Sequence, residues 1–192
     1  KGYNLTLDGV LGDKSLSAIK EYVFNETKAY TLNTKELVWV RTDMNLTNTF
    51  DDFVVLLIDK EIKYVAPCST TAGNFYVKNP ITYGGITGTA IAKKQQVIMS
   101  HQFISSADWK SLWLGMPYFK QMKPIEIYRD GNKDGKIDTQ ISTKGIYGIN
   151  LHHGGLGSIV DRWSAGCQVV PDKYWVEIIK YFKSCLLYTS PS

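Results

Sequence analysis

The sequence contains few cysteines and no long apolar run. Its 192 residues include 3 cysteines, too few for the disulfide framework that holds many small secreted domains together. The longest apolar run, residues 53–58, has the length of a strand, whereas a transmembrane helix needs about 20 apolar residues. We therefore expect no membrane span. Because the chain is 44% hydrophobic, we expect one well-buried globular domain plus a small additional segment.

Arginine is also scarce, and positive charge is not concentrated anywhere. The formal net charge is +4, and most of the cations are lysines spread along the chain. This distribution argues against nucleic acid as a partner. A mildly cationic surface would suit an anionic polymer such as a bacterial wall, and a solvated lysine-rich surface is equally compatible with it. We expect a monomer.

The last eight residues, 185–192, match a translation of the transposase adapter used in shotgun library preparation. We expect this segment to be a tail derived from sequencing, with a natural Ser/Pro-containing tail as the alternative. Without Cys185, two cysteines remain. Cys68 fits a small buried residue at the end of a strand, and Cys167 is a candidate nucleophile because histidines are near it in the sequence.

Residues 1–29 combine glycine turns with a short amphipathic pattern. A helix is predicted from Ser15, with Leu16, Ile19 and Tyr22 on one face. The segment resembles the C-terminal half of the small helical peptidoglycan-binding domain, and an ordinary helical hairpin is the alternative. Residues 30–36 are predicted to be a linker.

From residue 37 onward the pattern changes to strands. Runs of β-branched and aromatic residues between turn signals predict strands at residues 37–41, 52–59, 62–67, 74–78, 124–128 and 146–151. A hairpin turn is predicted at residues 59–61. Helical spacing is found only near residues 108–113 and at residues 172–183. The fold class is therefore predicted as β-rich α+β, with one helix after Cys167, over residues 37–184.

Two of the three histidines and one thiol fall between residues 152 and 167. A strand ending at a histidine, a glycine-rich turn and a Ser-x-Gly-Cys corner would place an imidazole beside the sulfur. A free thiol, with a pKa of about 8.5, is mostly protonated at neutral pH, and a nearby imidazole can accept its proton. Gly166 allows a tight turn, and the amides of Gly166 and Cys167 could stabilise an oxyanion. Such acyl transfer needs no metal.

Two motifs in this region resemble the catalytic domain of the L,D-transpeptidases, in which a His-Gly element is followed by Ser/Thr-x-Gly-Cys. The chain is still more similar to a phage-associated and gut-bacterial branch of that family. Residues 69–73 and 127–130 fit this branch too, so that the resemblance covers about residues 37–184. The two motifs are Gly148-Ile149-Asn150-Leu151-His152-His153-Gly154 and Trp163-Ser164-Ala165-Gly166-Cys167-Gln168.

The resemblance implies a mainly β, sandwich-like catalytic domain that acts on peptidoglycan stem peptides at the cell envelope, outside the cell, or after delivery by a phage. Cys167 would be the nucleophile, His152 the base, and Ser164 a brace for the loop, while Gly166 and Cys167 would supply oxyanion amides. His153 is the competing base. The alternatives are a carboxypeptidase or endopeptidase of phage-lysis type and a non-catalytic wall-binding module.

The chain departs from the family at Ala165 and Gln168, where many members have histidine and arginine. Recognition of substrate carboxylates is therefore assigned to Arg162, although a surface arginine is equally compatible with its position. The other candidate substrate-binding residues are His153, Gln168 and His101, and a structurally bonded imidazole is the alternative for His101. A zinc site at the histidines and Cys167 is less favoured, because adjacent histidines on a strand point to opposite faces.

Residues 130–138 have the spacing of a calcium loop. Asp130, Asn132 and Asp134 occupy its first, third and fifth positions, a glycine its sixth and Asp138 its ninth. The twelfth position is Ile141 in place of the usual glutamate. A polar hairpin turn is an equally compatible reading, so we expect at most weak calcium binding and otherwise no cofactor.

Overall fold

The computed structural model describes residues 17–19, 21–23, 35–82, 87–105, 115–140 and 142–183. These form two compact units, residues 1–38 with 55–65 and residues 39–54 with 66–192. Residues 17–19 and 21–23 are helical, as predicted for this segment. The helix predicted at residues 108–113 and the tail at residues 185–192 lie outside the described residues.

The first sheet has the strand order β1-β2-β3. The turn between β2 and β3 contains Asp59 at φ 51° and Lys60 at φ 68°, and two consecutive positive φ values are typical of a two-residue type I′ hairpin. The predicted turn is thereby confirmed, as are the three predicted strands to within a few residues. Their bounds are Lys35–Val40 for β1, Asp52–Ile58 for β2 and Glu61–Cys68 for β3.

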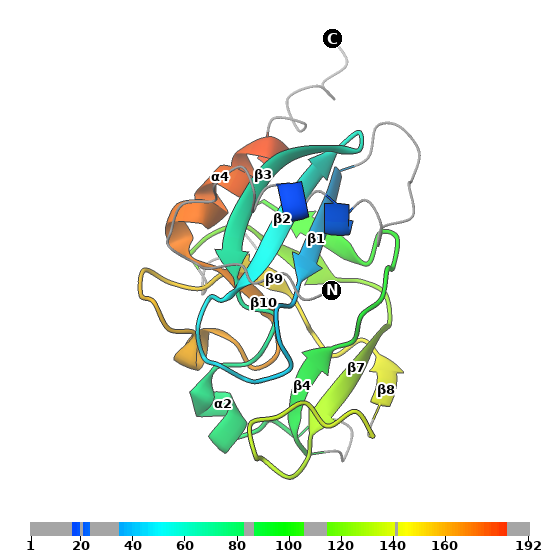
Figure 1. The fold of residues 1–192 in the computed structure, drawn as a ribbon, viewed down its shortest axis with the longest axis vertical. Coiled ribbons are helices and arrows are strands. Elements are labelled where there is room, and N and C mark those ends of the chain that lie inside the picture. Colours follow the sequence, from blue (N-terminus) through cyan, green and yellow to red (C-terminus); the bar gives the residue numbers. More distant parts are fainter. Residues whose placement is uncertain are drawn as a thin grey trace. The chain divides into compact units, whose positions relative to one another are not determined.

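A second sheet, of order β10-β9-β6-β5, carries the segment around Cys167. Strands β10 and β9 are parallel, whereas β6 is antiparallel to both β9 and β5. Helix α4 (Asp172–Lys183) follows β10 and contacts β9; Figure 1 draws this helix in orange. The strands are β5 (His101–Ile104), β6 (Tyr118–Gln121), β9 (Leu151–His153) and β10 (Gln168–Val170).

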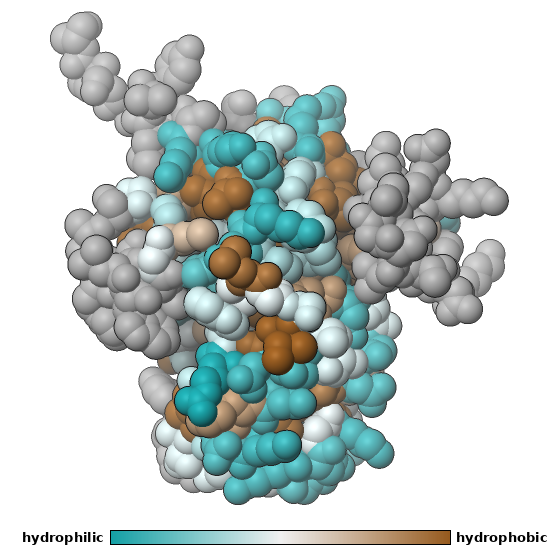
Figure 2. Space-filling model, turned by 90° about the vertical axis from the view of Figure 1, so that its left-hand side faces the viewer, coloured by the Kyte–Doolittle hydropathy of each residue, from teal (hydrophilic) through white to brown (hydrophobic). Residues whose placement is uncertain are grey.

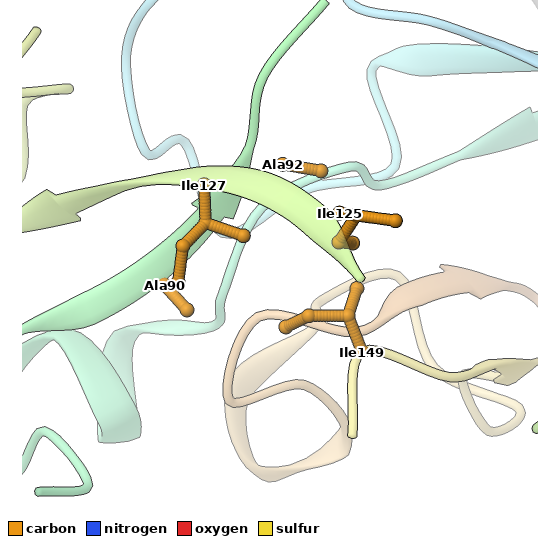
Figure 3. Packing of buried hydrophobic residues seen from close by; sticks show 5 residues of the cluster. All are labelled: Ala90, Ala92, Ile125, Ile127 and Ile149. Atoms are coloured by element: carbon orange, nitrogen blue, oxygen red, sulfur yellow. The ribbon is translucent and has the colours of Figure 1, made fainter. Parts of the chain in front are cut away.

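The third sheet has the order β4-β7-β8 and antiparallel pairing. One face buries a cluster of alanines and isoleucines that Ile149 joins from the segment preceding β9 (Figure 3). Its other face buries Ile91 against Leu46, Ala72 and Val77. The sheet therefore holds the approach to β9 in place through apolar packing. Its strands are β4 (Thr89–Ala92), β7 (Ile125–Asp130) and β8 (Ser142–Gly145).

The prediction of a strand at residues 74–78 is wrong, because Asn74–Lys78 form the short helix α2. The Gly73 carbonyl accepts hydrogen bonds from the amides of Tyr76 and Val77, and the Asn48 side chain accepts one from the Asn74 amide. These long-range and local contacts override the strand preference of a five-residue segment. Helix α2 lies beside the 3₁₀ helix η1 (Asp161–Trp163).

The other predicted strands and helices agree with the structure only in part. The strand at residues 124–128 and the helix at 172–183 are confirmed, whereas of residues 146–151 only Leu151 belongs to a strand. Strands β4, β5, β6, β8 and β10 were not predicted. Overall, the described residues are β-rich with few short helices, which confirms the β-rich α+β class.

No helix among the described segments is long and apolar enough to cross a bilayer. On the face drawn in Figure 2, hydrophobic residues form small areas separated by hydrophilic ones.

Candidate active site

The parallel pairing of β9 and β10 decides which histidine shares a face with Cys167. His152 lies opposite Val169, and His153 lies opposite Val170. Because side chains alternate along a strand, His152 and Val169 point to one face and His153 to the other. Cys167 lies just before β10, two residues from Val169, and the alternation continued by one residue would place its side chain on the face of His152. The register therefore favours His152 over His153 as the partner of the thiol.

The sulfur of Cys167 lies over the segment that leads into β9. The Asn150 amide donates to Cys167 Sγ at 3.4 Å, and Cys167 Sγ lies 3.5 Å from the Gly148 carbonyl oxygen. The Gln168 amide donates to the Asn150 carbonyl at 3.1 Å, which continues the β9–β10 ladder up to the cysteine. Since Cys167 is only half-buried, the sulfur can also meet a substrate.

Buried His152 is held in one tautomer by the backbone. Its side chain is almost entirely inaccessible, with 4% exposure, and Nδ1 lies 2.6 Å from the His153 carbonyl oxygen. Because a carbonyl only accepts hydrogen bonds, Nδ1 must carry the proton. In the neutral ring, Nε2 is then the unprotonated nitrogen that can accept a proton. This is the state that a general base for a thiol requires.

Ser164 braces the turn that presents Cys167. Its hydroxyl donates to the Cys167 carbonyl at 2.6 Å and accepts from the Gly166 amide at 3.1 Å, and Ser164 is 1% exposed. These contacts connect both sides of the turn, and the bracing role of Ser164 stays a prediction. They also occupy the Gly166 amide, so the oxyanion role predicted for that amide competes with an existing hydrogen bond.

Gly166 lies where no side chain fits. Its φ is +130°, and a Cβ added at this position would lie 2.5 Å from the Ala90 carbonyl oxygen. Ala90 belongs to β4 and to the apolar cluster that also holds Ile149. The cysteine turn and the segment preceding β9 are thus fixed to the same sheet, which sets the sulfur relative to the strand that carries His152.

His153 has a different environment. Its Nδ1 lies 2.8 Å from Asp172 Oδ1, and its ring centre lies 4.9 Å from that of Trp163. Asp172 is in the first turn of α4, and its amide donates to the Gly155 carbonyl at 3.0 Å. His153 therefore connects β9 to the start of α4. Asp172 was not predicted from the sequence, where an acidic residue at a helix start was the only local signal.

The other predicted substrate-binding residues, Arg162, Gln168 and His101, have the following contacts. The exposed Arg162 guanidinium lies 3.9 Å from the centre of the Phe75 ring, in a cation–π contact. Gln168 pairs with Leu151 and points to the face of His153. Both ring nitrogens of His101 have protein partners, Ser100 Oγ and the Ile149 carbonyl, each at 2.8 Å. The substrate roles of these residues stay predictions.

The free energy of unfolding should decrease below pH 6.5, and protonation of His101 should cause part of that decrease. Burial lowers the pKa of His101 below its usual 6.5, and the hydrogen bond to the Ile149 carbonyl partly opposes that shift. Because the pKa of His101 is lower in the folded protein, the unfolded chain takes up this proton at a higher pH than the folded protein does. The contribution of neutral His101 to the free energy of unfolding is therefore complete above pH 6.5 and is lost as the pH falls below it.

Urea unfolding of the native protein and of His101→Gln, measured at pH values above and below 6.5, tests this expectation. Uptake of one proton changes the free energy of unfolding by at most about 1.4 kcal/mol per pH unit. This part of the pH dependence should disappear in the variant. Equal slopes in the two proteins would show that His101 is not the group responsible.

The two described thiols should differ in reactivity. Burial raises the pKa of the Cys68 thiol well above its usual value, and Cys68 is 0% exposed, whereas Cys167 is half-buried. Because the thiolate is the reactive form, iodoacetamide should modify Cys167 in the folded protein and leave Cys68 unmodified. Peptide mapping by mass spectrometry before and after denaturation measures this, and modification of native Cys68 at the rate of Cys167 would contradict it.

Within the described ranges, no group of three or more His, Cys, Asp or Glu side chains is arranged to hold a metal ion. His152 and His153 point to opposite faces of β9, which argues against a zinc site shared by both.

No protein-family model, curated protein or solved structure matches this chain.

Proposed function

We propose that the protein is a cysteine-dependent acyl transferase of the L,D-transpeptidase type, acting on peptidoglycan stem peptides with a sandwich-like catalytic domain. One observation carries the proposal: the parallel β9–β10 register pairs His152 with Val169, two residues after Cys167, while His152 Nδ1 is bonded to the His153 carbonyl. A thiol next to an imidazole whose other nitrogen is bonded to an orienting group is typical of nucleophilic acyl transfer.

The proposed reaction uses one proton carrier. His152 Nε2 takes the proton of the Cys167 thiol while the sulfur attacks the carbonyl carbon of the L-centred residue in the stem peptide. The tetrahedral intermediate collapses when the C–N bond to the terminal D-amino acid breaks, and His152 returns the proton to the leaving amine. An acceptor amine then attacks the thioester and loses a proton to His152. The C–S bond breaks as the new amide forms, and His152 returns the proton to the sulfur.

Two segments that carry the family resemblance contact each other. Ser69 and Val169 exchange backbone hydrogen bonds at 2.8 and 2.9 Å, and the Gly73 amide donates to the Ser164 carbonyl at 3.0 Å. The Ser69–Gly73 segment therefore borders the turn that presents Cys167. This proximity supports the proposal, because residues from distant parts of the sequence with family-like motifs are brought to a single region.

Hydrolysis is the alternative activity. Both activities pass through the same thioester and differ only in whether an amine or water attacks it. In the proposed setting, the enzyme acts at the cell envelope or outside the cell, or is delivered by a phage. The presence of both Cys167 and His152 in this arrangement argues against a purely wall-binding module.

Product analysis separates these possibilities. The protein is incubated with a purified stem tetrapeptide, with and without a D-amino acid acceptor, and the products are identified by mass spectrometry. We expect the native protein and Cys68→Ala to exchange the terminal residue, and Cys167→Ala to leave the substrate unchanged. Loss of the terminal residue without exchange would indicate a hydrolase, and no reaction by folded native protein would contradict the proposed activity.

A further inference from the structure

The side chain of Gln121, the last residue of β6, is 3% exposed and forms a complete set of hydrogen bonds with the backbone. Its Oε1 accepts from the amides of Tyr147 and Ile149 at 3.1 and 3.0 Å. Its Nε2 donates to the carbonyls of Lys123 and Gly145 at 2.9 and 3.0 Å. A carboxamide has two acceptor positions and two donor hydrogens, and all four are used here. Gln121 therefore holds the chain between Gly145 and Ile149 in one conformation.

The segment that Gln121 holds is the one that contacts the sulfur. The Gly148 carbonyl oxygen lies 3.5 Å from Cys167 Sγ, and the Asn150 amide donates to Cys167 Sγ at 3.4 Å. Gly148 lies between the two residues whose amides are bonded to Gln121 Oε1. Asn150 is bonded to Gln121 as well, because its Oδ1 accepts from the Gln121 amide at 3.0 Å. These two contacts of the sulfur therefore come from residues that Gln121 fixes directly or through their neighbours.

His101 holds the same segment from the neighbouring strand. It pairs with Gln121 in the register of β5 and β6, and its Nε2 lies 2.8 Å from the Ile149 carbonyl oxygen. Because a carbonyl only accepts hydrogen bonds, Nε2 carries the proton. Gln121 and His101 thus bond the amide and the carbonyl of Ile149, and the Ile149 side chain is buried in the cluster of Figure 3. This segment is fixed to β5 and β6 through its backbone and to β4 and β7 through its side chain.

We propose that Gln121 is a positioning residue for the Cys167 nucleophile, and that it acts through the backbone of residues 147–150. Attack on a carbonyl needs the reacting atoms about 3–3.5 Å apart and aligned, and a displacement of about 1 Å can slow a reaction by about 10²-fold. Gln121 is buried and fully bonded to the protein, so it affects the sulfur without binding substrate. The effect on acylation rests on the proposed function, whereas the effect on the position of the sulfur does not.

Gln121→Met removes all four side-chain hydrogen bonds and keeps a side chain of similar size. With the full chain and a stem tetrapeptide, we expect kcat to fall by at least about tenfold. KM should stay within about twofold of the native value, because no contact with substrate is removed. Gln121→Glu is the second variant. It keeps an acceptor for the two amides and loses the donors to Lys123 and Gly145, and its kcat should also fall with KM unchanged.

Labelling of the two described thiols separates positioning from a general loosening of the fold, and it needs no stem peptide. Cys167 is half-buried and Cys68 is 0% exposed. In both Gln121 variants, iodoacetamide should modify Cys167 at least about threefold faster than in the native protein, since the released segment uncovers the sulfur. Cys68 should stay unmodified, as it does in the native protein. A merely structural role would instead make both thiols reactive.

Gln95→Met is the matched control. Exposed Gln95 bonds the backbone in a similar way at the start of β7, where its Nε2 donates to the Glu126 carbonyl at 2.6 Å and its Oε1 accepts from the Glu126 amide at 2.9 Å. This variant should have the kcat, KM and labelling rates of the native protein.

Three results would overturn the proposal: a native kcat in folded Gln121→Met, an unchanged labelling rate of Cys167, or labelling of Cys68 at the rate of Cys167. Should Gln121→Met fail to fold, the same measurements on Gln121→Glu decide the question. Native protein that leaves the tetrapeptide unchanged would contradict the proposed function, and the labelling rates would still decide the role of Gln121.

Discussion

Replacing His152 with asparagine is expected to slow acylation of Cys167 by about 10²–10⁴-fold, the usual contribution of a general base. Asparagine can donate to the His153 carbonyl through Nδ2, as His152 Nδ1 does at 2.6 Å. The variant therefore keeps the orienting hydrogen bond and loses only the nitrogen that accepts the thiol proton. The measurement is the initial rate of acyl-enzyme formation with a stem tetrapeptide, as a function of pH.

His153→Asn provides the matched comparison. Asparagine at this position can still donate to Asp172 Oδ1, which His153 Nδ1 contacts at 2.8 Å. Because His153 points to the opposite face of β9, its loss should change the acylation rate by less than about tenfold, or about 1.4 kcal/mol. Circular dichroism checks that both variants are folded. A slow His153 variant beside a nearly normal His152 variant would show that the base is His153.

Gly166→Ala is expected to reduce both stability and acylation. The added Cβ would lie 2.5 Å from the Ala90 carbonyl oxygen at a φ of +130°, so the turn must move or β4 must yield. Overpacking and backbone strain each cost about 1–3 kcal/mol, and we expect a total loss of about 2–5 kcal/mol in the free energy of unfolding. Because Cys167 is the next residue, the displaced turn should also misplace the sulfur.

Gly157→Ala is the control, because Gly157 lies in the same segment between β9 and β10 as Gly166. A Cβ at Gly157 would have only the Ile159 amide nitrogen near it, at 4.0 Å, so its effect on stability should stay within about 0.5 kcal/mol. Urea unfolding and the acylation rate are measured for both variants. A Gly166→Ala protein as stable and as active as Gly157→Ala would show that the turn does not need this glycine.

The sequence predicts elements with a clear local pattern. Strands β1, β2, β3 and β7 follow from runs of strand-forming residues between turns, and α4 follows from its apolar spacing. Strands β4, β5 and β6 have only four residues each, too few for a period to be recognised. Helix α2 depends on Asn48, which is 26 residues from Asn74 in the chain, and no local pattern shows such a contact.

The candidate site was predictable in its residue types and not in its geometry. Two histidines, a glycine-rich turn and a cysteine indicated the chemistry, but the choice between His152 and His153 depends on the strand register, since a shift by one residue exchanges the two faces. That register comes from the parallel pairing of β9 with β10. The contact of His153 with Asp172, 19 residues later, is equally a product of folding.

The most direct test of the central claim is to trap the acyl-enzyme and locate it. Native protein and Cys167→Ala are mixed briefly with a stem tetrapeptide, quenched in acid, and analysed as intact proteins and then as peptides by mass spectrometry. We predict that native protein gains the mass of the tetrapeptide less that of the released D-amino acid, on the peptide that contains Cys167, and that the variant gains nothing. An adduct on another residue, or turnover that persists in Cys167→Ala, would contradict the assignment of Cys167 as the nucleophile.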